Sequence, residues 1–270
     1  MNLAMFKKYL NLSWLPFLLP IPRSKHFKLS LILTIFIFSQ YELFSIGKRE
    51  LLQQLKSCRH SNYQLLCSEE ILPIQKVIRY VNFSNNDLHK RDRLDWLMIK
   101  NAISILENLT SLDLSSNELP QFSINNILNA MNALESCKNL KHLNLSFNHL
   151  NSLSTEAYLA LENLLEKLLE LRKLDVSNNN LGFLESLCFS EIGRIFSQCK
   201  KVEHLCLANN RLSKIRNLNW LKFVTEIHKL ENIKTLDLRN NLLRADQEKI
   251  LNDHDFYPKN EIWHKVQQQN

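Results

Sequence analysis

The feature that most constrains the fold of this chain is an asparagine that returns every 31 residues, as from position 86 to position 117. Apolar residues keep a fixed distance from it, as in Leu109-x-x-Leu112-x-Leu114-x-x-Asn117-x-Leu119. Six copies in phase indicate a repeat architecture, in which each copy buries its apolar face against its neighbours. The recurring residues are Asn86, Asn117, Asn148, Asn179, Asn210 and Asn241.

Each copy predicts one short strand. Leu112 and Leu114 alternate with Asp113, so a strand here points the leucines into a core and the aspartate outward. Asn117 follows where the chain leaves the strand, and a buried amide at that place can satisfy backbone groups of its own and adjacent copies. We therefore predict that the asparagine ladder is structural and that the stacked strands form a parallel sheet.

Each copy also predicts one helix. Apolar residues with i, i+3, i+4, i+7 spacing precede each strand, as at Leu161, Leu164, Leu165 and Leu168, and form the buried face of an amphipathic helix. Glu226 alone interrupts this stripe. Two cysteines take its last position, where other copies have leucine, so we predict packing roles for them and reduced thiols of a cytosolic protein. They are Cys137 and Cys199.

The six copies, from Ile78 to Leu243, resemble leucine-rich repeats. The resemblance implies an α/β solenoid with a parallel inner sheet and outer helices. Because strands stack roughly 4.8 Å apart and helices roughly 8 to 10 Å apart, the array must bend into a horseshoe with the sheet on its concave side. The period exceeds the usual range of roughly 20 to 29 residues, and the excess lies in the helical part. That places the repeats closest to the ribonuclease-inhibitor-like subclass.

The ends of the chain depart from the repeat pattern. We predict a poorly defined N-terminus over residues 1–26, a small helical segment over 27–73, the repeats over 74–243 and a C-terminal cap over 244–270. Aromatic and apolar residues of the cap are expected to cover the last repeat. These are Phe256, Tyr257, Ile262 and Trp263.

The segment 27–73 leaves three interpretations open. It can be a helical cap on the repeat core. Leu29 to Tyr41 is uncharged but shorter than the roughly 20 residues of a membrane-spanning helix, which leaves a signal or membrane anchor as an alternative. The run from Leu33 to Leu43, with Tyr63-x-Leu65-Leu66, also resembles an F-box, and that resemblance implies an Skp1-type adaptor as partner.

Outward-facing side chains of the predicted strands should form rows across the concave face. These rows mix basic and acidic residues, which favours a protein partner. They lack the interleaved aromatic residues that single-stranded nucleic acid needs, so no nucleic acid is expected despite the formal charge of +7. The predicted partner-binding residues are Arg79, Tyr80, Asp113, Lys141, His142, Asn144, Arg172, Lys173, Asp175, His204, Lys234 and Asp237.

No catalytic or metal site is predicted, and no cofactor. His142 and His204 lie two repeats apart in one row, about 10 Å by strand spacing, too far to share one metal ion. Gly-rich phosphate loops and hydrolase motifs are absent from the sequence.

The leading hypothesis is a non-enzymatic, monomeric, cytosolic protein that binds another protein on its concave face. Resemblance to repeat proteins of intracellular bacteria implies a secreted effector, cytosolic in the host cell. The alternatives are an F-box-like substrate receptor of a ubiquitin ligase and a binding module tethered to a membrane through residues 29–41.

Overall fold

The computed structural model describes residues 79–86, 88, 96, 99–100, 103–104, 106–121, 123–184 and 186–266. One three-residue strand from each repeat joins a parallel sheet in chain order, and Cα partners fall 31 residues apart, as Leu112, Leu143 and Leu174 do. Residues at the same position of successive repeats are therefore neighbours in the sheet. The strands are β1 (Tyr80–Asn82), β2 (Ser111–Asp113), β3 (His142–Asn144), β4 (Lys173–Asp175), β5 (His204–Cys206) and β6 (Thr235–Asp237).

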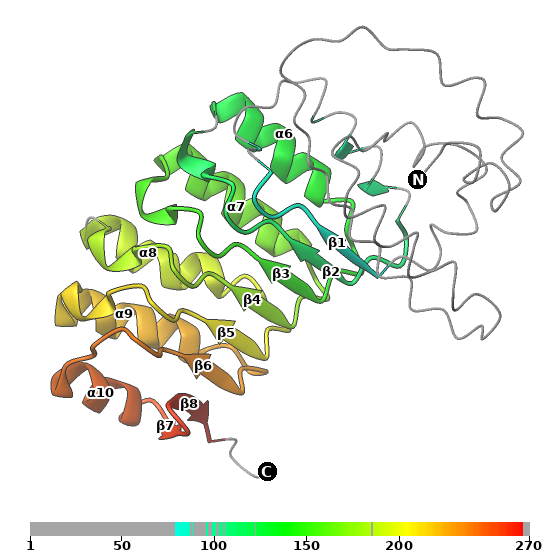
Figure 1. Ribbon diagram of the computed structural model, residues 1–270. Coiled ribbons are helices and arrows are strands. Elements are labelled where there is room, and N and C mark those ends of the chain that lie inside the picture. Colours follow the sequence, from blue (N-terminus) through cyan, green and yellow to red (C-terminus); the bar gives the residue numbers. More distant parts are fainter. Residues whose placement is uncertain are drawn as a thin grey trace, which may run out of the picture.

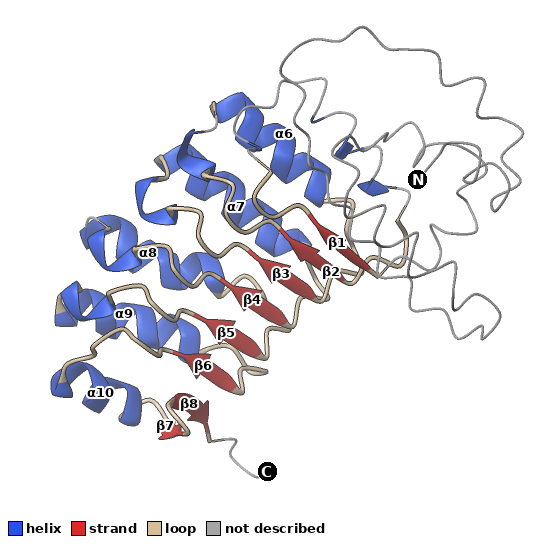
Figure 2. Cartoon of the chain, in the orientation of Figure 1, coloured by secondary structure: helices blue, strands red, loops and turns tan. Residues whose placement is uncertain are grey.

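A short 3-10 helix and then an α-helix follow most strands, and the α-helices form one layer on one side of the sheet (Figures 1 and 2). Ser123 and Ser154 begin two of the α-helices by accepting hydrogen bonds from the backbone of Asn126 and Ala157. The elements are η5 (Leu119–Gln121), α6 (Ile124–Leu134), η6 (Leu150–Ser152), α7 (Thr155–Lys167), η7 (Leu181–Phe183), α8 (Ser186–Phe196), η8 (Leu212–Lys214) and α9 (Asn217–His228).

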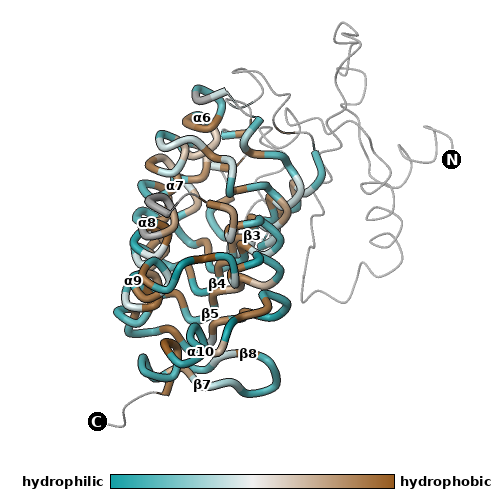
Figure 3. Tube along the Cα trace, turned by 90° about the vertical axis from the view of Figure 1, so that its left-hand side faces the viewer, coloured by the Kyte–Doolittle hydropathy of each residue, from teal (hydrophilic) through white to brown (hydrophobic). Residues whose placement is uncertain are grey.

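The core lies between the sheet and the helices and continues from repeat to repeat. The central residue of every strand is buried, as are the described stripe residues of each helix except Glu226. Cys137 and Cys199 are buried within this core, and Glu226 lies at its margin with an ion pair to Lys229. Figure 3 shows the resulting alternation of apolar and polar residues along the helical coils.

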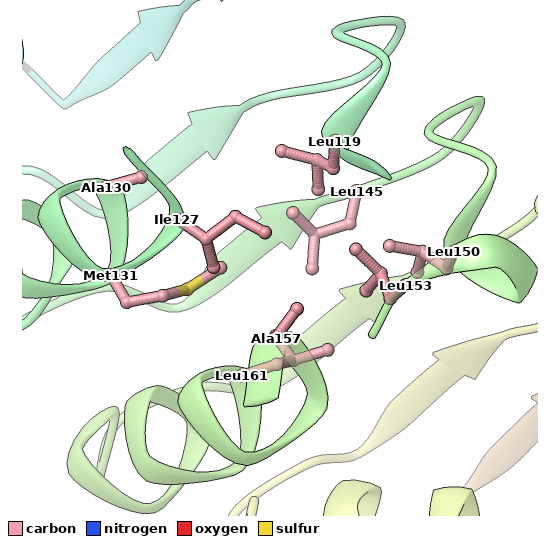
Figure 4. Close-up of a pocket in the computed structure, with 9 residues that line it drawn as sticks. All are labelled: Leu119, Ile127, Ala130, Met131, Leu145, Leu150, Leu153, Ala157 and Leu161. Carbon is pink, nitrogen blue, oxygen red and sulfur yellow. The ribbon is translucent and has the colours of Figure 1, made fainter. Parts of the chain in front are cut away.

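A small space remains inside the core between neighbouring repeats (Figure 4). Every side chain around it is apolar and comes from the helix stripes, the strands or the 3-10 turns. Such a space is imperfect packing rather than a ligand site, because ligand sites present polar groups that fix orientation. Its lining is Leu119, Ile127, Ala130, Met131, Leu145, Leu150, Leu153, Ala157 and Leu161.

Left-handed backbone flanks the ladder asparagines, a feature that the sequence pattern did not reveal. The residues immediately before and after each of Asn117, Asn148, Asn179, Asn210 and Asn241 have φ between 52° and 58°. Among the residue types used here, asparagine and histidine adopt this conformation more readily than the others do. Asn178 and Asn180 are therefore well suited to these positions, whereas Phe147 and Leu242 occupy them at a cost.

The sheet ends in an antiparallel hairpin beyond α10 (Ala245–Asn252). Strand β8 (Ile262–Lys265) pairs with β6, and β7 (Phe256–Lys259) forms the outer edge. Phe256 and Trp263 are buried against the last repeat, but Tyr257 is 47% exposed. The expectation that Tyr257 covers the core was wrong, because successive residues of a strand point to opposite faces and Phe256 takes the inward one.

Gly182 lies closer to the next repeat than the equivalent residues of other copies do. Its backbone N–H donates to the Asn210 carbonyl at 2.8 Å, whereas the equivalent Asn151 and Ser213 donate at 3.3 Å to Asn179 and Asn241. A Cβ on Gly182 would lie 2.0 Å from the carbonyl oxygen of Arg211. η7 therefore packs closer to η8 than a side chain at this position allows.

We expect Gly182→Ser to destabilise the protein by about 1 to 3 kcal/mol, because η7 must move away from η8 to admit the side chain. Urea unfolding followed by circular dichroism measures this change. Ser213→Ala, at the same repeat position but where a Cβ already fits, is the matched control and should change stability by less than about 0.5 kcal/mol. An equal effect of the two substitutions would contradict the close-packing argument.

Candidate functional site

The exposed side of strands β1 to β6, which we call the sheet face, presents three rows of side chains across the repeats. The first two rows lie at the amino ends of the strands and the third at their carboxyl ends. Basic residues dominate the first two rows between β3 and β6. Lys141, His142, Arg172, Lys173, His204 and Lys234 are all exposed.

The first row contains an ion network that crosses three repeats. Glu203 accepts hydrogen bonds from Arg172 on one side and from Lys234, at 2.5 Å, on the other. The Lys234 ammonium and then the Arg172 guanidinium lower the pKa of Glu203. Lys141 precedes this network by one repeat, and it forms no ion pair with any residue that the structure describes.

The second row brings two histidines to either side of a lysine. His142, Lys173 and His204 are consecutive Cα partners on β3, β4 and β5. Lys173 has no ion-pair partner within the described part of the chain. The Nδ1 atom of His204 lies 2.7 Å from the Thr235 hydroxyl.

Both imidazoles of this row have a lowered pKa. For His142 the causes are partial desolvation and then the charges of Lys173, His204 and Lys141. For His204 desolvation again comes first; Glu203 opposes the lowering, and the charges of Lys234, Lys173 and His264 add to it. Protonation of these histidines therefore places additional positive charge beside lysines that are already charged, which is unfavourable.

His264 extends the second row, and sequence reasoning missed it. Strand β8 runs antiparallel to β6 and places His264 opposite Thr235. The 31-residue period could not reveal this neighbour, because the hairpin reverses the direction of the chain.

Side chains of the third row form hydrogen bonds with the turns that follow their own strands. Asp113 accepts hydrogen bonds from the backbone N–H and the hydroxyl of Ser115, and Asp175 accepts one from the Ser177 N–H at 2.9 Å. Asn144 bonds Ser146 in the same way. These predicted partner-binding residues shape the exit from the strand and leave only part of each side chain for a ligand. Asp237 likewise accepts from the Arg239 N–H, at 3.2 Å, and also pairs with the Arg239 guanidinium.

Cys206 takes the third-row position on β5 but is not a nucleophile. Its Sγ lies 3.6 Å from Oδ2 of Asp237, and burial raises its pKa to about 12. The thiolate that nucleophilic chemistry requires is scarce at such a pKa. In the described part of the chain, no group of three or more His, Cys, Asp or Glu side chains is placed to hold a metal ion.

From Asn117 onward, the ladder asparagines follow the third row in the chain, and backbone groups engage both their Oδ1 and their Nδ2 atoms. Oδ1 of Asn179 accepts from the backbone N–H of Asn148 and of Leu150, one repeat earlier. Its Nδ2 donates to the carbonyls of Leu145, Val176 and Ser177. The same pattern recurs at Asn117, Asn210 and Asn241. These amides join successive repeats and have no capacity left for a ligand.

The segment 27–73 lies outside the described residues, so its interpretations as a cap, an anchor or an F-box-like unit stay predictions. Within the described residues no helix combines the length and the apolar character needed to cross a bilayer.

A parallel sheet, one helix per 31-residue copy and an asparagine ladder together define a leucine-rich-repeat solenoid fold. The family model for the leucine-rich repeat matches residues 139–161 and 170–192, which fall in the third and fourth copies and the helices after them. Proteins of this kind generally serve as scaffolds that bind other proteins. Assignment to the ribonuclease-inhibitor-like subclass stays a prediction.

Two solved structures are similar to this chain. The leucine-rich-repeat-containing protein LegL7 of Legionella pneumophila is 20% identical over 71% of this chain and 67% of its own, with a TM-score of 0.44. The tropomodulin C-terminal domain of Caenorhabditis elegans is 16% identical over 59% of this chain and 90% of its own, with a TM-score of 0.45. No curated protein sequence matches the chain.

Proposed function

We propose that this protein is a non-enzymatic scaffold that binds a partner protein on the sheet face. The observation that carries the proposal is the pair Lys141 and Lys173, two exposed ammonium groups without an ion pair among the described residues, at the amino ends of the adjacent strands β3 and β4. The Asn ladder and the continuous core hold the strands that carry them. A preorganised surface loses little conformational entropy on binding.

A protein suits this face better than a nucleic acid. The basic rows are bounded along one side by Asp113, Asp175 and Asp237. A phosphodiester backbone laid on the face would bring its charges against those carboxylates, whereas a protein can present residues of both signs. Aromatic platforms for bases are also missing from the described rows, where Tyr80 is the only aromatic side chain.

Site-specific photo-cross-linking in cells of the source organism tests the proposal. A photoreactive amino acid replaces Ser111 or Thr235 on the sheet face and, as the matched control, Asn163 on the exposed side of α7. We expect a discrete protein adduct from the sheet-face positions and none from Asn163. Combining either position with Arg172→Glu and Lys173→Glu should lower the yield by about tenfold.

Adducts that form only from Asn163, or sheet-face adducts that persist unchanged after the charge reversals, would contradict the proposal. Circular dichroism of each variant establishes that the fold is retained. The substitutions are surface changes, so they should alter stability by less than about 0.5 kcal/mol each.

A cytosolic location belongs to the same proposal, and the free thiols of Cys137, Cys199 and Cys206 support it. The hypotheses of a secreted effector acting in a host cell, of an F-box-like receptor bound to an Skp1-type adaptor and of a membrane-tethered module stay predictions from the sequence.

A further inference from the structure

The sheet face carries its available positive charge in one narrow strip. His142 on β3, Lys173 on β4 and His204 on β5 lie at the amino ends of three consecutive strands, and Lys141 immediately precedes β3, whose first residue is His142. The neighbouring Arg172 and Lys234 are already engaged with Glu203. We call the four residues Lys141, His142, Lys173 and His204 the basic strip.

The acidic row beside the strip does not neutralise it. Asp113 and Asp175 each direct one oxygen into the turn that follows their own strand, and Asp237 pairs with Arg239. Lys173 and Asp175 point to the same face two residues apart, yet no salt bridge joins them in the described structure. The strip therefore keeps a charge that a ligand can satisfy.

The spacing of the strip indicates the geometry of that ligand. Successive strands are roughly 4.8 Å apart, so one cationic position follows another at that interval along the solenoid axis. One turn of an α-helix rises about 5.4 Å. A helix with one carboxylate per turn, laid along the axis, therefore stays in register with three strands to within about 1.2 Å, which flexible lysine and glutamate side chains absorb.

We propose that the basic strip binds an acidic helical segment of the partner protein, lying across β3, β4 and β5 with about one carboxylate per turn facing Lys141, Lys173 and the two histidines. This inference rests on the proposed function and specifies its partner. The third row bounds the strip, so the helix carries neutral or basic residues on the side that faces Asp113 and Asp175.

Binding of such a segment depends on pH with a definite sign. His142 is surrounded by Lys141, Lys173 and His204, and His204 by Lys173, Glu203, Lys234, Thr235 and His264. In the free protein partial desolvation and the neighbouring lysine and histidine charges lower the pKa of both imidazoles, so both are largely neutral at pH 7.5. Carboxylates of the ligand favour the imidazolium form, so affinity rises as the pH falls toward 5.5.

Fluorescence anisotropy of the full chain with a synthetic peptide of about 16 residues, long enough to be helical, tests the proposal at low ionic strength. The probe has one glutamate per turn on a single helix face among alanine and glutamine residues. A scrambled peptide of the same composition and a single-stranded oligonucleotide of similar charge are the comparisons. We expect the periodic peptide to bind most tightly and its affinity to rise at pH 5.5.

Matched charge reversals identify the surface. Lys141→Glu with Lys173→Glu should weaken binding at least about tenfold, whereas Lys214→Glu with Lys222→Glu, the same change in net charge on exposed lysines of η8 and α9, should leave it within about twofold. His142→Gln with His204→Gln should remove the pH dependence while retaining binding at pH 7.5.

The proposal is overturned if the periodic peptide does not bind, if the scrambled peptide or the oligonucleotide binds equally well, or if the two pairs of lysine variants behave alike. These outcomes are distinct from failure of the proposed function. A partner that cross-links from Ser111 or Thr235 but is not displaced by the periodic peptide would retain the protein scaffold and reject the acidic helix.

Discussion

Asn179→Ala is expected to destabilise the protein by at least about 3 kcal/mol. The side chain is fully buried and makes five hydrogen bonds to backbone groups of the third and fourth repeats, with donor–acceptor distances from 2.8 to 3.2 Å. Its removal leaves two N–H groups and three carbonyls short of a partner in an interior with little room for water. Each such group costs roughly 1 to 3 kcal/mol, and partial relaxation makes the total less than the sum.

Urea unfolding gives this change in the free energy of unfolding, and two further variants separate its causes. Asn163→Ala on the exposed side of α7 should have an effect within about 0.5 kcal/mol. Asn179→Asp keeps both acceptor interactions but places a carboxylate oxygen against the carbonyls of Leu145, Val176 and Ser177, so we expect a loss at pH 7 at least as large as that of Asn179→Ala.

The introduced carboxyl has a definite pH response. Its folded-state pKa is raised, because burial and the facing carbonyls disfavour the charged form. The unfolded state therefore ionises at a lower pH than the folded state, and the penalty grows as the pH rises through this window. Relative to the unmodified protein, Asn179→Asp should recover stability between pH 7 and pH 4. A loss under about 1 kcal/mol for Asn179→Ala would show that water replaces the amide and that the ladder does not join the repeats.

The sequence predicted the repeating part of this fold because a residue in a solenoid meets mainly the same neighbours in every copy. Leu143 is paired in the sheet with Leu112 and Leu174, which take the same position in the adjacent repeats. All three side chains face the core and are buried. Period and alternation alone therefore specified strands, helices and the ladder.

Features that differ between copies escaped the same reasoning. The left-handed backbone at Phe147 and Leu242 follows from the turn around the ladder rather than from those side chains. The outward direction of Tyr257 and the position of His264 depend on a hairpin that occurs once.

The candidate site was predicted as rows of exposed residues, and the structure distinguishes the residues within those rows. Arg172 and Lys173 are adjacent in sequence and both cationic, yet Arg172 pairs with Glu203 and Lys173 pairs with none of the described residues. The partner of Arg172 comes from the next repeat, 31 residues away. Composition gives the charge of a row, but only three-dimensional geometry shows which charges are already compensated.

The C-terminal end of the solenoid depends on a single large side chain. Trp220 on α9 is fully buried, stacks on Phe223 with ring centroids 5.5 Å apart and donates from Nε1 to the Gln247 carbonyl on α10 at 3.1 Å. Gln247 is itself buried and donates back to the Leu212 carbonyl at 3.0 Å. Trp220 therefore joins the last repeat to the cap through both packing and hydrogen bonding.

Trp220→Ala is expected to cost about 3 to 5 kcal/mol, the range for removal of a large aromatic side chain from a core. Trp220→Phe, which keeps most of the packing and loses the hydrogen bond, should cost about 1 to 2 kcal/mol. Because a solenoid is stabilised by contacts between neighbouring units, the effect should concentrate at the end beyond Trp220. Amide hydrogen exchange should therefore quicken in α10 and the β7–β8 hairpin more than in β3 and α7.

Trp263, in the hairpin and 7% exposed, gives an independent readout, since its fluorescence should shift toward that of a solvated indole in Trp220→Ala. Equal losses for the alanine and phenylalanine variants would assign the effect to the hydrogen bond rather than to packing. Unchanged exchange in residues 245–265 would mean that the cap is held by Arg244, whose guanidinium donates to the carbonyls of Ser213 and Ile215, without the need for Trp220. The first result would contradict a packing contribution of the indole ring, and the second would contradict a cap anchored by Trp220.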